Sequence, residues 1–205
     1  MALLNEQEQR QVAQAIAAVE RTTDAELVTV LAARADDYRY AAPLWAALLA
    51  LLVPGLVNFY ALWLDARYLW LLQLACFAGV TLLLQLPALN RRLVPRRLRH
   101  WHAANLARRQ FLEQRLHHTD GATGILIFVC EAERYVEILV DRGIARHLPD
   151  ASWQAMVARF TQQVGQGQTL QGFLDCIAGC GELLAQHLPA SHERNELPNH
   201  LVILD

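Results

Sequence analysis

Five acidic residues lie beside the segments expected to form strands and helices, and they are the first candidates for chemistry. They are Asp24, Glu26, Asp120, Asp141 and Asp150. If loops bring three of these carboxylates together, their oxygens could hold Ca²⁺ or Mg²⁺, which prefer such ligands. The same residue types also serve as helix caps and turn residues, and Asp150 is well placed as an N-cap. Both roles, cation ligand and structural cap, stay open at this point.

Phosphoryl transfer would need cationic groups for the phosphoryl oxygens and a nucleophile or metal-activated water. Arg134, Arg142 and Arg146 are candidate anion-binding residues beside Asp141. The sequence has no phosphate-binding P-loop and no Cys-x5-Arg signature, and Cys130 lies in an apolar run typical of a buried strand. No catalytic residue is therefore assigned.

The four cysteines are expected to be reduced and to pack in the interior. They are Cys76, Cys130, Cys176 and Cys180, and none forms a CxxC pair. Cys176 and Cys180 are four residues apart on one predicted helix, where they share a face but are poorly placed for a disulfide. Free thiols are typical of a cytoplasmic domain.

Two uncharged segments, 43–64 and 69–89, are predicted to form a transmembrane hairpin. At 1.5 Å per residue, each is long enough for about 30 Å of hydrocarbon. Four residues separate the two segments, so the helices must run antiparallel. This hairpin positions everything else in the chain at a membrane surface.

Arginines predict the orientation of the hairpin. Five follow the second segment: Arg91, Arg92, Arg96, Arg97 and Arg99. Because positive charge stays on the cytoplasmic side, both termini are expected in the cytoplasm of an inner-membrane protein. The same membrane-proximal basic cluster could also hold anionic lipid headgroups.

The rest of the chain predicts a small sheet covered by helices. Asn5 and Glu8 form a capping box before a first helix, and apolar runs at 25–33, 124–130 and 135–140 predict strands. A long basic helix is expected over 95–116, with these packing residues: Leu98, Trp101, Leu106, Phe111 and Leu112.

Two more helices are expected in the last third of the chain. Asp150 should cap the first of them, and Thr169 is a candidate cap for the second. The final apolar run, 201–204, is expected to dock either as a strand or as a lid. The sequence does not decide between these two.

These elements predict an α/β domain in which helices cover a small sheet, interrupted by the transmembrane hairpin. The first 35 residues are too few to bury a core alone. Residues 1–40 and 95–190 should therefore form one discontinuous cytoplasmic domain, with the hairpin over 43–89 and a C-terminal tail over 191–205.

Several segments resemble the TPM domain family, a small α/β/α domain of bacterial envelope and chloroplast proteins. The matching segments, in order, are residues 23–28, 123–129, 133–144, Trp153, 165–172 and 195–198. Relatives have been linked to photosystem maintenance, modulation of a membrane receptor, calcium binding and acid phosphatase activity. The resemblance implies a three-layer α/β/α sandwich with a small mixed sheet. It implies an accessory role at membranes more firmly than it implies any reaction.

We therefore expect a membrane-anchored accessory or interaction domain that assists another membrane protein without turnover. The alternatives are a metal-dependent phosphatase and a divalent-cation-binding module. The expected partners are the lipid bilayer and a membrane protein; homo-oligomerisation is left open. A net charge of -2 argues against nucleic acid as a partner.

Overall fold

The computed structural model describes residues 4–60, 65–86, 93–119, 121–149, 151–191 and 200–204. The chain divides into two compact units. The first, which we call the α/β unit, contains Met1–Ala35 and His100–Asp205, and the second, the hairpin unit, contains Asp36–Arg99. The α/β unit is therefore built from both ends of the chain.

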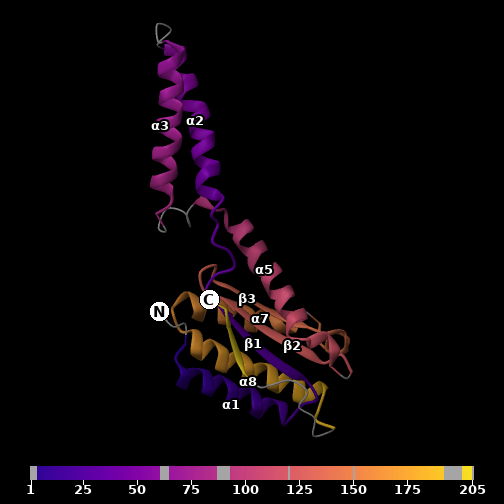
Figure 1. Ribbon diagram of the computed structural model, residues 1–205. Coiled ribbons are helices and arrows are strands. Elements are labelled where there is room, and N and C mark those ends of the chain that lie inside the picture. The colour runs from indigo at the N-terminus through magenta and orange to yellow at the C-terminus, as the bar shows by residue number, and fades with distance from the viewer. Residues whose placement is uncertain are drawn as a thin grey trace. The chain divides into compact units, whose positions relative to one another are not determined.

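A mixed four-stranded sheet forms the centre of the α/β unit (Figure 1). The strands lie in the order β3-β2-β1-β4. Their bounds are β1 (Glu26–Ala32), β2 (Gly124–Cys130), β3 (Tyr135–Val140) and β4 (Leu201–Leu204). β1 runs parallel to β2 and to β4, whereas β2 and β3 form an antiparallel hairpin. The predicted strands over 124–130 and 135–140 match the observed ones.

β1 and β2 are buried at every residue. They lie in the middle of the sheet with helices on both faces, which explains why their sequences are almost continuously apolar rather than alternating. Their register pairs Glu26 with Gly124 and Ala32 with Cys130, so the two strands begin and end together. Residues that flank these strands therefore meet at two common ends of the sheet.

One face of the sheet is covered by α1 (Glu6–Glu20), α7 (Ala151–Gly165) and α8 (Thr169–His187). Their fully buried side chains include Ile16, Phe160 and Phe173, which pack with Leu27 and Ile127 of the central strands. Burial of this layer stabilises the fold by about 25 cal/mol per Å² of apolar surface removed from water.

α1 begins with the predicted capping box. The Asn5 side chain accepts a hydrogen bond from the Glu8 N–H at 2.9 Å, and the Asn5 N–H donates to Glu8 Oε2 at 2.7 Å. These bonds satisfy two backbone donors that the first helical turn would otherwise leave open.

The opposite face is covered by α5 (Arg96–Glu113) and the short 3-10 helix η1 (Leu116–His118). Ala103, Ala107 and Gln110 are the buried residues of α5. The predicted packing face was partly wrong, because Leu98, Trp101 and Leu112 are exposed. Small alanines let the helix lie close to the sheet, which turns these larger side chains outward. Helices on both faces of a mixed sheet confirm the predicted three-layer α/β/α architecture.

α8 begins differently from the prediction. Gln168 is its N-cap, without a side-chain capping bond, and Thr169 is the first helical residue. The Thr169 hydroxyl donates to Glu131 Oε1 at 2.8 Å. The hydroxyl thus joins α8 to the β2–β3 turn through a charge-assisted hydrogen bond.

The C-terminal apolar run forms a strand. β4 pairs in parallel with β1 from Thr29↔Leu201 to Ala32↔Leu204. The pairing covers an edge of β1 that would otherwise expose unpaired backbone groups.

The hairpin unit contains α2 (Ala41–Tyr60) and α3 (Ala66–Leu84), which pack against each other. Both helices are long enough and apolar enough to cross a membrane, judged by length and composition. α2 continues through Pro54. Residues 61–64 and 87–89 of the two predicted spans lie outside the described residues.

Candidate functional site

Three of the five candidate cation ligands flank the same end of the sheet. Asp24 and Glu26 lie at the start of β1, and Asp141 follows the end of β3. The Asp141 N–H donates to the Gly124 carbonyl at 2.9 Å, and the Glu26 N–H donates to the Thr123 carbonyl at 3.2 Å. Antiparallel pairing of β3 with β2 is what brings Asp141 to this end.

Asp24 uses both carboxylate oxygens to hold the chain segment after α8. Its Oδ1 accepts the Ser191 N–H at 2.8 Å, and its Oδ2 accepts the Ser191 hydroxyl. Its own carbonyl accepts the Thr123 hydroxyl at 2.9 Å. Asp24 therefore connects the starts of two strands with the C-terminal segment.

Glu26 and Asp141 have different surroundings. Glu26 is buried, and strand alternation places it on the same face as Val28, toward α5. Asp141 is half-buried and is the N-cap of α6 (Arg142–Ala145), where its Oδ1 accepts the Arg142 N–H at 2.7 Å. The cap role that the sequence left open applies to Asp141.

Within the described residues, no group of three His, Cys, Asp or Glu side chains could hold a metal ion. Asp120 and Asp150 lie outside the described residues. The cation site therefore stays a prediction, and Asp24 would have to exchange its Ser191 partner for the ion.

The candidate anion-binding arginines lie at two ends of β3. Arg142 and Arg146 are exposed on α6 and at its C-cap, beside Asp141. Arg134 is exposed in the β2–β3 turn, with a left-handed φ of 51°. The six residues of β3 separate Arg134 from the other two.

The arginines predicted to lie near the membrane are only partly within the described residues. Arg96 and Arg97 are exposed in the first turn of α5, and Arg99 is half-buried. Arg91 and Arg92 lie outside the described residues.

A buried polar cluster at the other end of the sheet was not predicted. Glu133 is buried, and its Oε2 accepts the Ala35 N–H at 3.1 Å and the Cys130 thiol at 2.7 Å. Burial, and then Glu133, raise the pKa of the Cys130 thiol far above its usual range. Cys130 is therefore a protonated core thiol, consistent with the strand context of its sequence. All four cysteines are free.

A second polar cluster lies between α5 and β3. Tyr135 and Glu137 share a face of β3 and are hydrogen bonded, and the His100 ring lies 5.4 Å from the Tyr135 ring. Burial raises the pKa of Glu137, while its bond to Tyr135 and the charge of Arg108 act in the opposite direction. The signal in the sequence was the two-residue spacing of Tyr135 and Glu137 in a predicted strand.

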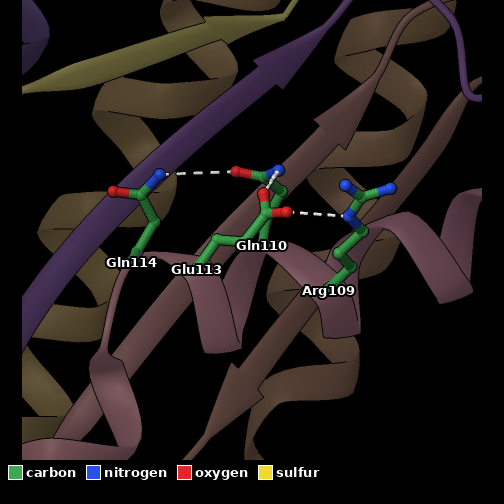
Figure 2. A network of polar contacts seen from close by, with 4 residues as sticks. All are labelled: Arg109, Gln110, Glu113 and Gln114. Carbon is green, nitrogen blue, oxygen red and sulfur yellow. Dashed lines mark hydrogen bonds and ion pairs between the residues drawn. The ribbon is translucent and has the colours of Figure 1, made fainter.

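The last turns of α5 carry a chain of polar contacts (Figure 2). Arg109 Nε donates to Glu113 Oε1 at 2.7 Å, and Gln110 Nε2 donates to Glu113 Oε2 at 2.5 Å. Gln114 Nε2 then donates to Gln110 Oε1 at 3.4 Å. Gln110 is buried, so this network anchors an exposed arginine to the part of α5 that faces the sheet.

The hairpin unit has an open apolar hollow of about 270 Å³ between its two helices. Ala47 and Ala50 of α2 and Trp70, Gln73 and Phe77 of α3 are among the residues that line it. Small residues on one helix opposite aromatic rings on the other create this space, which is suited to apolar chains rather than to polar substrates.

Comparison with known proteins supports the family resemblance. The family model described as the TPM domain matches residues 94–183. Among solved structures, the chain is similar to the NMR structure of BA42 protein from the psychrophilic bacterium Bizionia argentinensis, with a TM-score of 0.62 and 18% identity. That match covers 98% of this chain and 96% of the other. At this identity the match is evidence for the fold alone.

A search of curated proteins gave no match. The family match includes α5, η1, β2, β3, α6, α7 and most of α8, and so contains two strands of the sheet and helices from both of its faces. Residues 94–183 of the chain therefore match the TPM domain family model.

Proposed function

We propose that this protein is a membrane-anchored TPM domain that assists another membrane protein as an interaction module, without turnover. The observation that carries the proposal is the apolar hairpin between the two sequence segments of the α/β unit. Large side chains such as Leu51 and Phe59 are 66% and 74% exposed on it. In water this surface would aggregate, whereas in a bilayer it is solvated.

The polar groups of the α/β unit support an interaction role over catalysis. Asp24, Asp141 and Glu133 each accept hydrogen bonds that hold segments of the fold together. The thiol of Cys130 is protonated and buried. These carboxylates act as structural hydrogen-bond acceptors, and the thiol packs in the core. We therefore propose that the exposed surface binds the partner.

Membrane anchoring is tested by alkaline carbonate extraction of membranes from cells that express the full chain. We expect the protein to stay in the membrane pellet. Replacing both Leu52 and Leu74, which are exposed on α2 and α3, with arginine should release it, since each arginine at the centre of a span costs about 3 kcal/mol. Leu112→Arg outside the hairpin is the matched control and should stay in the pellet.

Topology is tested with reporters fused to each end of the chain. Both termini are proposed to be cytoplasmic, so fluorescent-protein fusions should fluoresce and periplasmic-enzyme fusions should be inactive. Extraction of the unaltered chain by carbonate would contradict the anchoring proposal, and a periplasmic terminus would contradict the topology.

The second candidate is a divalent-cation module or metal-dependent phosphatase at the acidic end of the sheet. It is favoured by the presence of Asp24, Glu26 and Asp141 at that one end. Thermal unfolding of the detergent-solubilised chain with EDTA, Ca²⁺ or Mg²⁺, with a phosphatase assay on the same samples, separates the candidates. A metal-dependent rise in melting point with turnover lost in Asp141→Asn would favour the enzyme. A rise without turnover would favour a cation module.

A further inference from the structure

We propose that the outward face of α5 binds the surface of an anionic lipid bilayer and holds the α/β unit against the membrane. This inference rests on the proposed membrane anchoring. We call the face the outer stripe and define it by Trp101, Arg108, Arg109 and Leu112.

Exposure singles out the outer stripe. Within the described part of the α/β unit, the exposed large hydrophobic side chains are Trp101 and Leu112, each 58% exposed. Isolated exposed hydrophobics are ordinary on protein surfaces. Here, however, both belong to the same helix and flank two exposed arginines.

Helical geometry places these residues together. Trp101, Arg108 and Leu112 are separated by seven and four residues, which is close to two turns and one turn of an α-helix. Ala103 and Ala107 are fully buried on the side that meets the sheet. Because packing fixes that buried side, the outer stripe must face away from the sheet.

The chemistry of the outer stripe matches an anionic interface. Tryptophan is enriched at the level of lipid headgroups, and arginine can cover apolar surface with its stem while its guanidinium binds phosphate. Such a mixture of basic and large apolar side chains is typical of helices that lie on membranes.

Charge argues against a second copy of this chain as the occupant. The described α5 sequence contains five arginines and one acidic residue, Glu113. Two outer stripes would repel each other, whereas a leaflet with anionic lipids would attract them at about 1 kcal/mol for an unpaired arginine such as Arg108. Arg109 contributes less, because its Nε is paired with Glu113 at 2.7 Å. The net charge of the chain is -2, so this excess of positive charge is local to the helix.

The chain also keeps α5 near the bilayer if the hairpin spans it. α3 ends at Leu84 and α5 begins at Arg96. The residues between them reach at most about 40 Å when fully extended. The bilayer is thus always within reach, and even weak attraction to its surface is amplified by the high effective concentration.

The experiment uses the full chain in lipid nanodiscs with an environment-sensitive NBD probe. The probe is attached at Asn105→Cys, between Trp101 and Arg108, in a Cys76→Ala background. Cys76 is the partly exposed native thiol, whereas the other three are buried. A matched probe at Gln154→Cys lies on an exposed position of α7, which covers the opposite face of the sheet.

We expect the Asn105 probe to shift to the blue and brighten in phosphatidylcholine discs containing phosphatidylglycerol, and to stay water-like in phosphatidylcholine alone. The Gln154 probe should remain water-like in both. Salt at about 1 M should reverse the shift, because the Debye length falls to about 3 Å.

Removal of charge tests the arginines directly. The double variant R108Q/R109Q should lower the ratio of docked to undocked states by roughly 5-fold to 30-fold, because an unpaired arginine contributes about 5-fold and Arg109 is partly neutralised by Glu113 at 2.7 Å. R10Q/R21Q removes the same charge from α1 and its C-cap on the opposite layer and should leave the ratio unchanged.

An equal shift in neutral discs, an equal shift of the Gln154 probe, or no effect of R108Q/R109Q would overturn the inference. A chain that enters the discs but keeps the Asn105 probe in water would overturn it while leaving membrane anchoring intact. If carbonate releases the chain from membranes and the chain does not enter the discs, both the proposed function and this inference are overturned.

Discussion

Asp24 and Ser191 lie 167 residues apart in the sequence and are joined by two hydrogen bonds, one from the backbone N–H and one from the hydroxyl of Ser191. The neighbouring Thr23 hydroxyl donates to the Leu188 carbonyl at 2.6 Å. Together these bonds fasten the end of α8 beside the start of β1. The C-terminal segment that supplies β4 is therefore anchored before it reaches the sheet edge.

We expect D24A and S191A each to lower the free energy of unfolding by about 1 kcal/mol, the usual contribution of such bonds. Because the two side chains act as one unit, the double variant should cost little more than either single variant. Urea unfolding of all four proteins gives this double-mutant cycle. Strict additivity would contradict the pairing.

Thr29 offers a stabilising substitution. Its hydroxyl is fully buried in the middle of β1 without a hydrogen-bond partner within the described residues. T29V keeps the shape and removes the cost of burying that hydroxyl, so it should raise the free energy of unfolding by about 1–2 kcal/mol.

Thr23 is the matched control for this change. It is also buried, but its hydroxyl donates to Leu188 and accepts from the Ala25 N–H. T23V should therefore destabilise the protein by about 1–3 kcal/mol under the same conditions. Equal effects of the two variants would contradict the hydrogen-bond assignment.

Gly172 lets α8 pack closely on α7. A Cβ at this position would lie 2.2 Å from the ring of Phe160. That ring is buried, and its centroid lies 5.0 Å from the centroid of the Phe173 ring in an edge-on arrangement. G172A should lower the free energy of unfolding by about 1–3 kcal/mol, because the buried Phe160 ring would have to shift. G165A meets no atom within 4 Å and should be neutral or stabilising by up to about 1 kcal/mol.

Asp175 makes the packing of α7 on α8 dependent on pH. Hydrogen bonds from Gln163 and Gln171, and then the charge of Arg159, hold the pKa of Asp175 below its ordinary value. The folded state thus favours the ionised form. Its stabilising effect is complete above the ordinary carboxyl pKa, near 3.9, and is lost as pH falls through the lower folded value.

We therefore expect D175N to lower the melting temperature at pH 7 and to have a progressively smaller effect as the solution is acidified below about pH 4. E6Q removes the exposed pair of Glu6 and Arg10 at 3.7 Å and should change little. A D175N effect that is independent of pH would contradict the charge-based mechanism.

Sequence rules that act over a few residues predicted the elements that neighbouring residues stabilise. Asn5 and Glu8 are close in sequence, and their capping box formed as predicted. Strands over 124–130 and 135–140 were visible because a continuous apolar run beside a short polar turn has few other stable structures. The uncharged segments of the hairpin were equally clear from composition.

The same rules did not predict which face of α5 is buried. Leu98, Trp101 and Leu112 were expected to pack, yet the buried face consists of Ala103, Ala107 and Gln110. The small side chains of Ala103 and Ala107 let α5 pack closely on the sheet, and the larger side chains face away from it. This preference depends on the partner surface, which a single helix sequence does not contain.

The apolar patterns of the chain alone were sufficient to predict a small sheet covered by helices and two spans suited to a membrane, because hydrophobic periodicity and caps act over a few residues. The TPM-like fold was predicted from the resemblance of several segments to that family. Only the tertiary structure decided that β4 pairs with β1, that Asp24 holds Ser191, and that Trp101 and Leu112 face outward. Those outcomes depend on which surfaces meet after the chain has closed loops of more than a hundred residues, and local sequence carries no record of that choice.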